Sequence, residues 1–109
     1  MELSNALDAL DALSQETRLA VFRELVRAGP GGLSAGEIAL RLRVRQNTMS
    51  SHLKQLHSAA LVNSCRDGRR VMYTANYQTA RELILFLMED CCAGNAEVCV
   101  PLAEALATN

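Results

Sequence analysis

Residues 34–74 read SAGEIALRLRVRQNTMSSHLKQLHSAALVNSCRDGRRVMYT. Apolar residues recur at helical spacing in the first part of this segment and at strand-like spacing in its last part. Ser34 and Glu37 have the S-x-x-E spacing of a capping box, so we expect a helix that begins there and continues to about Leu42. A connection of three residues, 43–45, leads to a second helix. Two short helices joined in this way predict a helix-turn-helix.

The second of these helices has one apolar side and one polar side. We expect Met49, Leu53 and Leu56 to be buried. The short polar side chains opposite can donate and accept hydrogen bonds, as a helix that reads base edges in the major groove must do. For His52 we expect a hydrogen bond to the backbone or to a phosphate rather than a metal. The residues of this helix that we assign to DNA binding are Gln46, Asn47, Thr48, Ser50, Ser51, His52 and Lys54.

A β-hairpin is expected after the second helix. Segments 61–66 and 69–74 have the pattern of strands, and Asp67-Gly68 between them is the signal for a type I′ turn, in which both central residues have positive φ. A hairpin in this position is a wing. Its arginines can hold DNA phosphates, which sets the register of the protein without reading sequence. The wing residues that we assign to DNA binding are Arg66, Arg69 and Arg70.

Charge is distributed unevenly along the chain. The net charge of all 109 residues is −1, yet residues 41–70 carry seven basic side chains and one acidic side chain, a net charge of +6. The flanking segments, 1–40 and 71–109, are both acidic overall. Such asymmetry is typical of a surface that neutralises phosphates. A solvated basic helix face is the alternative explanation.

Two helices are expected before this basic segment. Leu3, Leu7 and Leu10 recur at steps of three and four residues in the first helix. The second helix extends from about 16 to 28 and ends at the Gly-Pro-Gly-Gly of residues 29–32. The residues that the second helix is expected to bury are Leu19, Phe22, Leu25 and Val26.

A last helix, from about Tyr77, contains six consecutive apolar residues at 83–88, which cover every side of the helix. A single small domain cannot easily enclose such a helix, so we expect a second copy of the chain to cover it together with the first helix. A central helix in a monomer is the alternative. The residues that we assign to the homodimer interface are Leu3, Leu7, Leu10, Leu83 and Leu87.

The composition favours one mainly helical domain over residues 1–109. Half of the residues are apolar, only 4% are aromatic, and Leu, Ala and Val dominate the apolar set. No stretch approaches the roughly 20 apolar residues that cross a bilayer, and no secretory signal is evident, so we expect a cytoplasmic protein without a membrane partner. No nucleophile with a paired base and no phosphate-binding glycine loop is found, so we expect neither an enzyme nor an organic cofactor.

Three local patterns occur together in this sequence: Thr17-Arg18-Leu19, Ser50-x-His52-Leu53, and Arg66-x-Gly68-Arg69 followed by Tyr73. With these patterns the sequence resembles, over nearly its whole length, the ArsR/SmtB family of winged helix-turn-helix metal-responsive repressors. The resemblance implies a homodimer formed by the first and last helices, and double-stranded operator DNA that is bound without metal and released when metal binds.

Three cysteines, Cys91, Cys92 and Cys99, lie within nine residues, and Gly94 between them allows the chain to turn back. Clustered thiols in a cytosolic chain indicate metal or redox chemistry rather than disulfides. Three thiolates suit a three-coordinate thiophilic centre, As(III), Sb(III) or methylarsenite, better than a tetrahedral zinc site. The cluster resembles the C-terminal arsenic site of certain family members. We therefore assign inducer binding, with As(III) as the inducer, to residues 89–101.

Other inducer sites of the family have no counterpart, because residues 34–42 contain no cysteine and residues 77–89 contain no histidine. Three alternatives remain for the cysteine cluster: buried small hydrophobes, a thiol redox sensor, or a zinc site that staples an interaction module. The fourth cysteine, Cys65, is expected to be a packed residue of a wing strand. The expected function is a metalloid-responsive transcriptional repressor.

Overall fold

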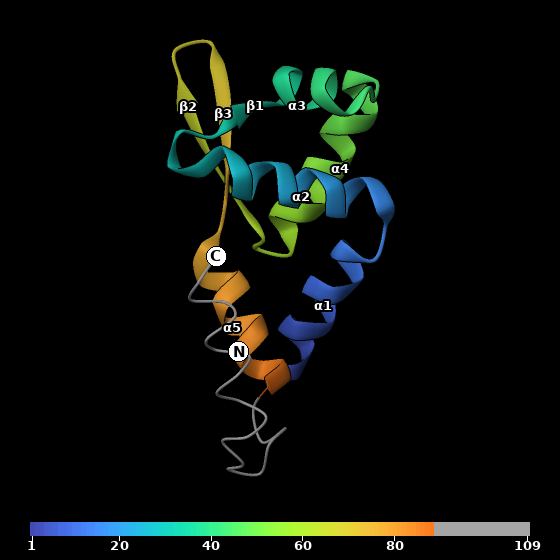
Figure 1. Ribbon diagram of the computed structural model, residues 1–109, viewed down its shortest axis with the longest axis vertical. Coiled ribbons are helices and arrows are strands. Elements are labelled where there is room, and N and C mark those ends of the chain that lie inside the picture. Colours follow the sequence, from blue (N-terminus) through green and yellow to red (C-terminus); the bar gives the residue numbers. More distant parts are fainter. Residues whose placement is uncertain (89–109) are drawn as a thin grey trace.

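The computed structural model describes residues 1–88 of the chain. In Figure 1 the sheet, α3 and the start of α4 form one end of the molecule, α2 crosses the middle, and α1 and α5 lie side by side at the other end. The helices are α1 (Leu3–Leu13), α2 (Glu16–Ala28), the short 3-10 helix η1 (Gly29–Gly31), α3 (Ala35–Leu42), α4 (Gln46–Ser58) and α5 (Tyr77–Met88). The strands are β1 (Leu33–Ser34), β2 (Val62–Asp67) and β3 (Arg70–Ala75).

The predicted capping box begins α3. The Ser34 hydroxyl accepts a hydrogen bond from the Glu37 amide at 3.2 Å, and the Glu37 carboxylate accepts one from the Ser34 amide at 3.1 Å. These two bonds satisfy amides that have no partner within the helix. At its other end α3 stops where Arg43 adopts a left-handed conformation with φ 56°. The chain thereby turns sharply into α4, and the helix-turn-helix is confirmed.

The core lies between the helices and the sheet, and α1 and α5 contribute smaller parts of it than α2, α3 and α4 do. The α4 residues Met49, Leu53 and Leu56 are buried, as predicted. The prediction for α2 was wrong at two positions, because Leu19 and Val26 are exposed. This helix is apolar over more of its circumference than the core can cover, and its buried stripe is centred on other residues. The fully buried residues of α2 are Val21 and Leu25, with Phe22 partly buried beside them.

The sheet has three antiparallel strands in the order β1-β3-β2. The hairpin was predicted, but its turn was placed one residue too early. Asp67 pairs with Arg70, so the two central residues are Gly68 and Arg69. Only Gly68 has a positive φ, 64°, which is the pattern of a type II′ turn rather than type I′. The short strand β1 was not predicted.

Gly32 allows β1 to approach β3. Its φ of 70° and ψ of −173° lie in a region that only glycine adopts readily. A Cβ atom at this position would lie 2.8 Å from Cγ2 of Thr74 and even closer to the backbone oxygen of Tyr73. The close approach lets Leu33 pair with Tyr73 and Ser34 with Met72.

These elements form a winged helix-turn-helix, mainly helical with one small sheet, as the sequence predicted. The α3–α4 pair is the helix-turn-helix, and the β2–β3 hairpin is the wing. Within residues 1–88, every helix is too short or too polar to span a membrane.

Replacing Gly32 tests the contact between β1 and β3. We expect Gly32→Ala to lower the free energy of unfolding by about 2–4 kcal/mol, because strained backbone and steric overlap each cost on the order of 1–3 kcal/mol. Gly31→Ala is the matched control, since a Cβ atom there would meet nothing within 4 Å and its φ is not positive. That control should change stability by less than about 1 kcal/mol. Equal urea midpoints for the two variants would contradict the expectation.

Candidate nucleic-acid interface

The polar side of α4 faces solvent. Its residues are held there because Met49, Leu53 and Leu56 on the opposite side are seated in the core. Ser50 donates its hydroxyl hydrogen to the Gln46 carbonyl at 3.1 Å and so leaves its oxygen lone pairs outward as acceptors. The assigned residues that are exposed on α4 are Gln46, Asn47, Thr48, Ser50, Ser51 and Lys54.

The start of α4 favours an anion. Arg45 is its N-cap residue and makes no side-chain cap, and the first turn holds no acidic residue. The Asn47 side-chain oxygen accepts the Thr48 amide at 2.9 Å. The positive end of the helix dipole therefore faces solvent without a carboxylate to neutralise it. A DNA phosphate is an anion of the kind that such a helix start attracts.

His52 is only partly exposed, and its Nδ1 atom is buried. Within residues 1–88 this nitrogen has no hydrogen-bond partner, so the expected bond to the backbone is not formed there. Burial lowers the pKa of His52 below its ordinary value of 6.5, and the nearby Arg18 charge lowers it further. The imidazole is therefore held in its neutral form.

Arg18, which belongs to one of the patterns behind the family resemblance, ties α1 to α2. Its Nε atom donates a hydrogen bond to the Ala12 carbonyl at 2.7 Å, and its backbone amide donates one to the Gln15 side chain at 2.9 Å. The same guanidinium supplies the charge that acts on His52. Arg18 thus links the end of α1, the start of α2 and the middle of α4.

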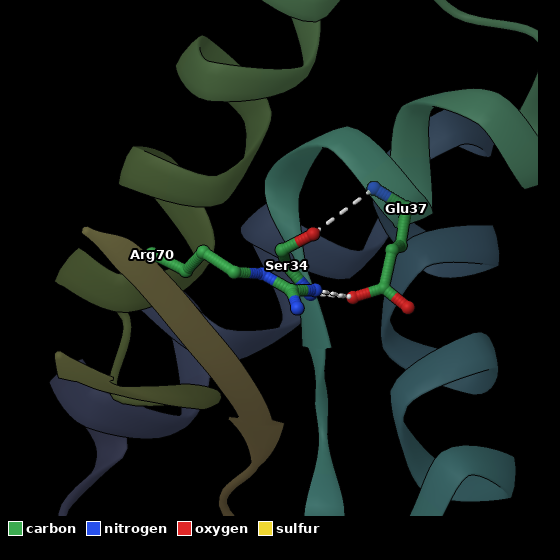
Figure 2. A network of polar contacts seen from close by, with 3 residues as sticks. All are labelled: Ser34, Glu37 and Arg70. Atoms are coloured by element: carbon green, nitrogen blue, oxygen red, sulfur yellow. Dashed lines mark hydrogen bonds and ion pairs between the residues drawn. The ribbon is translucent and has the colours of Figure 1, made fainter. Parts of the chain in front are cut away.

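All three predicted wing arginines are exposed, but they differ in their partners. Arg70 forms an ion pair with Glu37, in which Nη2 lies 2.5 Å from Oε1 (Figure 2). Within the described residues, neither Arg66 nor Arg69 has a carboxylate partner, whereas Arg41 of α3 pairs with Glu24 at 3.6 Å. The basic charge is therefore not equally available to a phosphate at every position. Sequence reasoning missed the Arg70 pairing.

The pKa of Glu37 is lowered, so this carboxylate stays ionised. The hydrogen bond from the Ser34 backbone is the largest cause, followed by the Ser34 side chain; desolvation acts in the opposite direction, and the charges of Arg70 and Arg41 lower the pKa by smaller amounts. Glu37 therefore serves at once as helix cap and as the anionic partner of the wing.

An open groove separates α4 from the wing. Residues of both elements line it, including Ser50, Lys54 and His57 of α4, Ser64 of β2 and Tyr73 of β3. The lining combines hydroxyl groups and the cationic side chain of Lys54 with the apolar side chain of Leu53. Its hydroxyl groups and its cation are groups that can contact the sugar-phosphate backbone of DNA.

The predicted inducer cysteines, Cys91, Cys92 and Cys99, lie outside the described residues. Within residues 1–88, His, Cys, Asp and Glu form no cluster of three that could hold a metal ion. Cys65 is exposed, so the expectation that it packs as a strand residue was wrong. Beyond Val62, the residues of β2 are exposed on both faces of the strand, which leaves no interior for a side chain there.

The residues assigned to a dimer interface are mostly exposed in the single chain. On α1 the core is formed by alanines, Ala6, Ala9 and Ala12, while the leucines face outward. Leu83 of α5 is an exception, because only 6% of it is exposed and it belongs to the core of its own chain. The exposed apolar residues of the two helices are Leu3, Leu7 and Leu10 on α1 and Ile84, Leu85 and Leu87 on α5.

Comparison with known proteins adds the following matches. The family described as Helix-turn-helix domain matches residues 13–65. The transcriptional activator HlyU of Vibrio cholerae is 30% identical over 92 residues, which cover 84% of this chain and 82% of that protein. A solved structure of reduced HlyU has a TM-score of 0.62 at 28% identity and covers 79% of this chain and 90% of that one.

Two further solved structures are similar. An ArsR-like transcriptional regulator from Rhodococcus sp. RHA1 has a TM-score of 0.71 at 26% identity, covering 94% of this chain and 92% of that chain. A possible transcriptional regulator for arsenical resistance has a TM-score of 0.65 at 25% identity, covering 73% and 80% of the two chains.

The lowered pKa of His52 predicts a pH-dependent stability. As pH falls through 6.5, the unfolded chain binds the proton before the folded chain does, so the folded state loses stability with acidification. We expect the urea midpoint to fall more steeply between about pH 7.5 and 5.5 in the wild type than in His52→Gln. His57→Gln, which removes an exposed imidazole from the same helix, is the matched control. Identical dependence of the urea midpoint on pH for the wild type and His52→Gln would contradict a lowered pKa of His52 in the folded protein.

Proposed function

This chain belongs to the ArsR family of winged helix-turn-helix transcriptional regulators, and on that premise we propose that it binds operator DNA as a homodimer, represses transcription and is released by As(III). The observation that carries the DNA-binding part is the exposed polar side of α4 beside a wing in which two arginines have no carboxylate partner within residues 1–88. The inducer and the direction of regulation rest on the cysteine cluster and on the family.

In the proposed complex the start of α4 enters the major groove. Gln46 and Asn47 have side chains that can read adenine with two hydrogen bonds. Hydroxyl groups of the same helix can contact either a hydrogen-bond donor or an acceptor on a base edge. Lys54 and the wing arginines that lack a carboxylate partner in the described part of the chain, Arg66 and Arg69, hold the phosphates on either side. The dipole of α4 adds a further attraction for the backbone.

The homodimer is supported by the apolar faces of α1 and α5. Leu7 is 56% exposed and Leu87 is 52% exposed, and two helices that meet at one end of the molecule both carry such residues. Exposed apolar surface of this kind marks an interaction site. In a two-fold dimer the same patch covers itself, and the two α4 helices then reach half-sites about one DNA turn apart.

The inducer site is supported by sequence position. Cys91 lies three residues beyond Met88, the last described residue of α5, so the cluster follows the proposed dimer helix closely in sequence. The structural neighbour whose name refers to arsenical resistance supports a metalloid inducer. Closing Cys91, Cys92 and Cys99 around As(III) would change the end of that helix and hence the spacing of the two α4 helices. The ion must bind the off-DNA state more tightly for release to follow.

A redox switch is the second candidate for the same cysteines. The relative whose structure is described as reduced HlyU favours it, because that description implies that the oxidation state of that protein matters. In this alternative a thiolate of the cluster is oxidised by a peroxide and condenses with a neighbouring thiol to a disulfide, with two protons and two electrons passing to the peroxide.

Cysteine variants separate the two candidates. We expect arsenite to release the wild type from a duplex that it has selected out of a random-sequence pool, and Cys91→Ser, Cys92→Ser or Cys99→Ser to require at least about tenfold more arsenite, since a trivalent ion then lacks a thiolate. Cys65→Ser is the control and should respond like the wild type. Release by peroxide with loss of two thiols per chain, but not by arsenite, would favour the redox switch; retained arsenite release in every variant would exclude the cluster.

Charged substitutions test the dimer interface. We expect Leu7→Glu and Leu87→Glu to raise the dimer dissociation constant by about tenfold or more, because a carboxylate at an apolar interface must be desolvated. Leu40→Glu is the matched control, since Leu40 is 82% exposed on α3, away from α1 and α5. Sedimentation velocity measures the dimer dissociation constant of all three variants. Equal dimer dissociation constants for Leu7→Glu and Leu40→Glu would contradict the proposed interface.

A further inference from the structure

We propose that Glu37 and Arg70 form a strut that fixes the wing against the helix-turn-helix, so that Arg70 positions the wing and does not bind a DNA phosphate. This inference rests on the proposed DNA-binding function and replaces the sequence-based assignment of Arg70 to phosphate contact. It makes Glu37 and Arg70 positioning residues for operator recognition.

The strut joins two elements that are far apart in sequence. Arg70 is the first residue of β3, at the wing turn, and Glu37 lies in the first turn of α3, 33 residues earlier. The guanidinium reaches across to Oε1 of Glu37, as Figure 2 shows. That oxygen also accepts the Ser34 amide at 3.1 Å. One carboxylate oxygen therefore holds the start of α3 and the base of the wing turn together.

The capping box makes this ion pair stronger than an ordinary surface pair. Exposed ion pairs contribute little because two long side chains must both be ordered to form them. Here the Glu37 side chain is already ordered by its bond to the Ser34 amide, and Ser34 is fixed in turn by pairing with Met72 of β3. Only the Arg70 side chain has to be ordered for the pair to form.

The same pairing removes Arg70 from the set of residues available to DNA. A protein that binds DNA releases about one counterion for each phosphate that its cations neutralise. The charge of Arg70 is already balanced by Glu37, whereas Arg66 and Arg69 have no carboxylate partner within residues 1–88. Arg66 and Arg69 are thus the wing residues that add to the salt dependence of binding.

The strut also sets the position of the wing relative to the start of α4, and therefore the geometry with which both contact DNA. The helices α3 and α4 pack against each other, and β3 contacts both β1 and α3. Fixing the wing on α3 therefore fixes the distance between the start of α4 and the wing turn. Two contact regions held at a fixed distance fit DNA in one register, so loss of the strut reduces sequence discrimination more than it reduces total attraction to DNA.

Salt titrations of binding test the proposal with five proteins: wild type, Glu37→Gln, Arg70→Gln, the double variant that combines these two substitutions, and Arg69→Gln. Glutamine at position 37 keeps the capping box and removes only the charge. Arg69→Gln is the matched control, because Arg69 is the neighbouring exposed arginine and has no carboxylate partner among residues 1–88. The probes are a duplex selected by the wild type from a random-sequence pool and a scrambled duplex of equal length. Dissociation constants are measured at several KCl concentrations.

We expect Arg69→Gln to reduce the slope of log affinity against log salt by about 0.9 on both duplexes, as one lost phosphate contact should. Arg70→Gln should leave the slope unchanged. Arg70→Gln and Glu37→Gln should each lower the preference for the selected duplex by about 3- to 10-fold, and the double variant should be no worse than either single one. The proposal is overturned if Arg70→Gln reduces the slope as Arg69→Gln does, or if both single variants keep the wild-type preference for the selected duplex.

Hydrogen exchange without DNA tests the strut independently of operator binding. Amides of the β2–β3 hairpin should exchange faster in Arg70→Gln and Glu37→Gln than in Arg69→Gln, and equal protection in all three would overturn the strut. Arg70→Lys, which keeps the charge but not the planar fork, serves where Arg70→Gln does not fold, and it should show an intermediate protection. If the wild type selects no duplex from the pool, the proposed function fails, and the exchange experiment still decides on the strut.

Discussion

The buried stripe of α4 is the contact on which the other features of this protein depend. Met49, Leu53 and Leu56 have almost no exposed surface, so α4 cannot rotate about its axis without taking one of them out of the core. That constraint turns the short polar side chains outward as a set. It also determines where α3 and the wing must lie, because both pack around the same helix. A surface made of flexible side chains is thus presented on a rigid support.

Features set by neighbours in sequence could be predicted from sequence, and features set by distant residues could not. The bounds of α2, α3 and α4, and the capping box of Ser34 and Glu37, follow from local hydrogen bonding and helical periodicity. The ion pair of Arg70 with Glu37 and the pairing of β1 with β3 depend on how the chain folds back. No local pattern encodes either of them.

Errors within the predicted elements have the same origin. The turn of the wing was placed one residue early because Asp67-Gly68 is a strong local signal, whereas the observed pairing of Asp67 with Arg70 is decided by the whole hairpin. Leu19 and Leu83 show a second source of error. The pattern of apolar residues in a helix does not tell whether a given side chain is covered by its own chain or by a partner. Leu19 is exposed and Leu83 is buried, although both were read from apolar stripes.

The alanines on the inner side of α1 have a consequence for how the protein assembles. A buried methyl group removes much less apolar area from water than a leucine side chain does, so Ala6, Ala9 and Ala12, with the partly buried Leu13, hold α1 to its own domain only weakly. The other leucines of α1, Leu3, Leu7 and Leu10, are exposed. With the proposed pairing, the order of this helix is linked by mass action to the amount of protein present. Dilution would loosen α1 before it melts the helix-turn-helix, and the cellular level of the regulator would itself tune the fraction of chains competent to bind DNA.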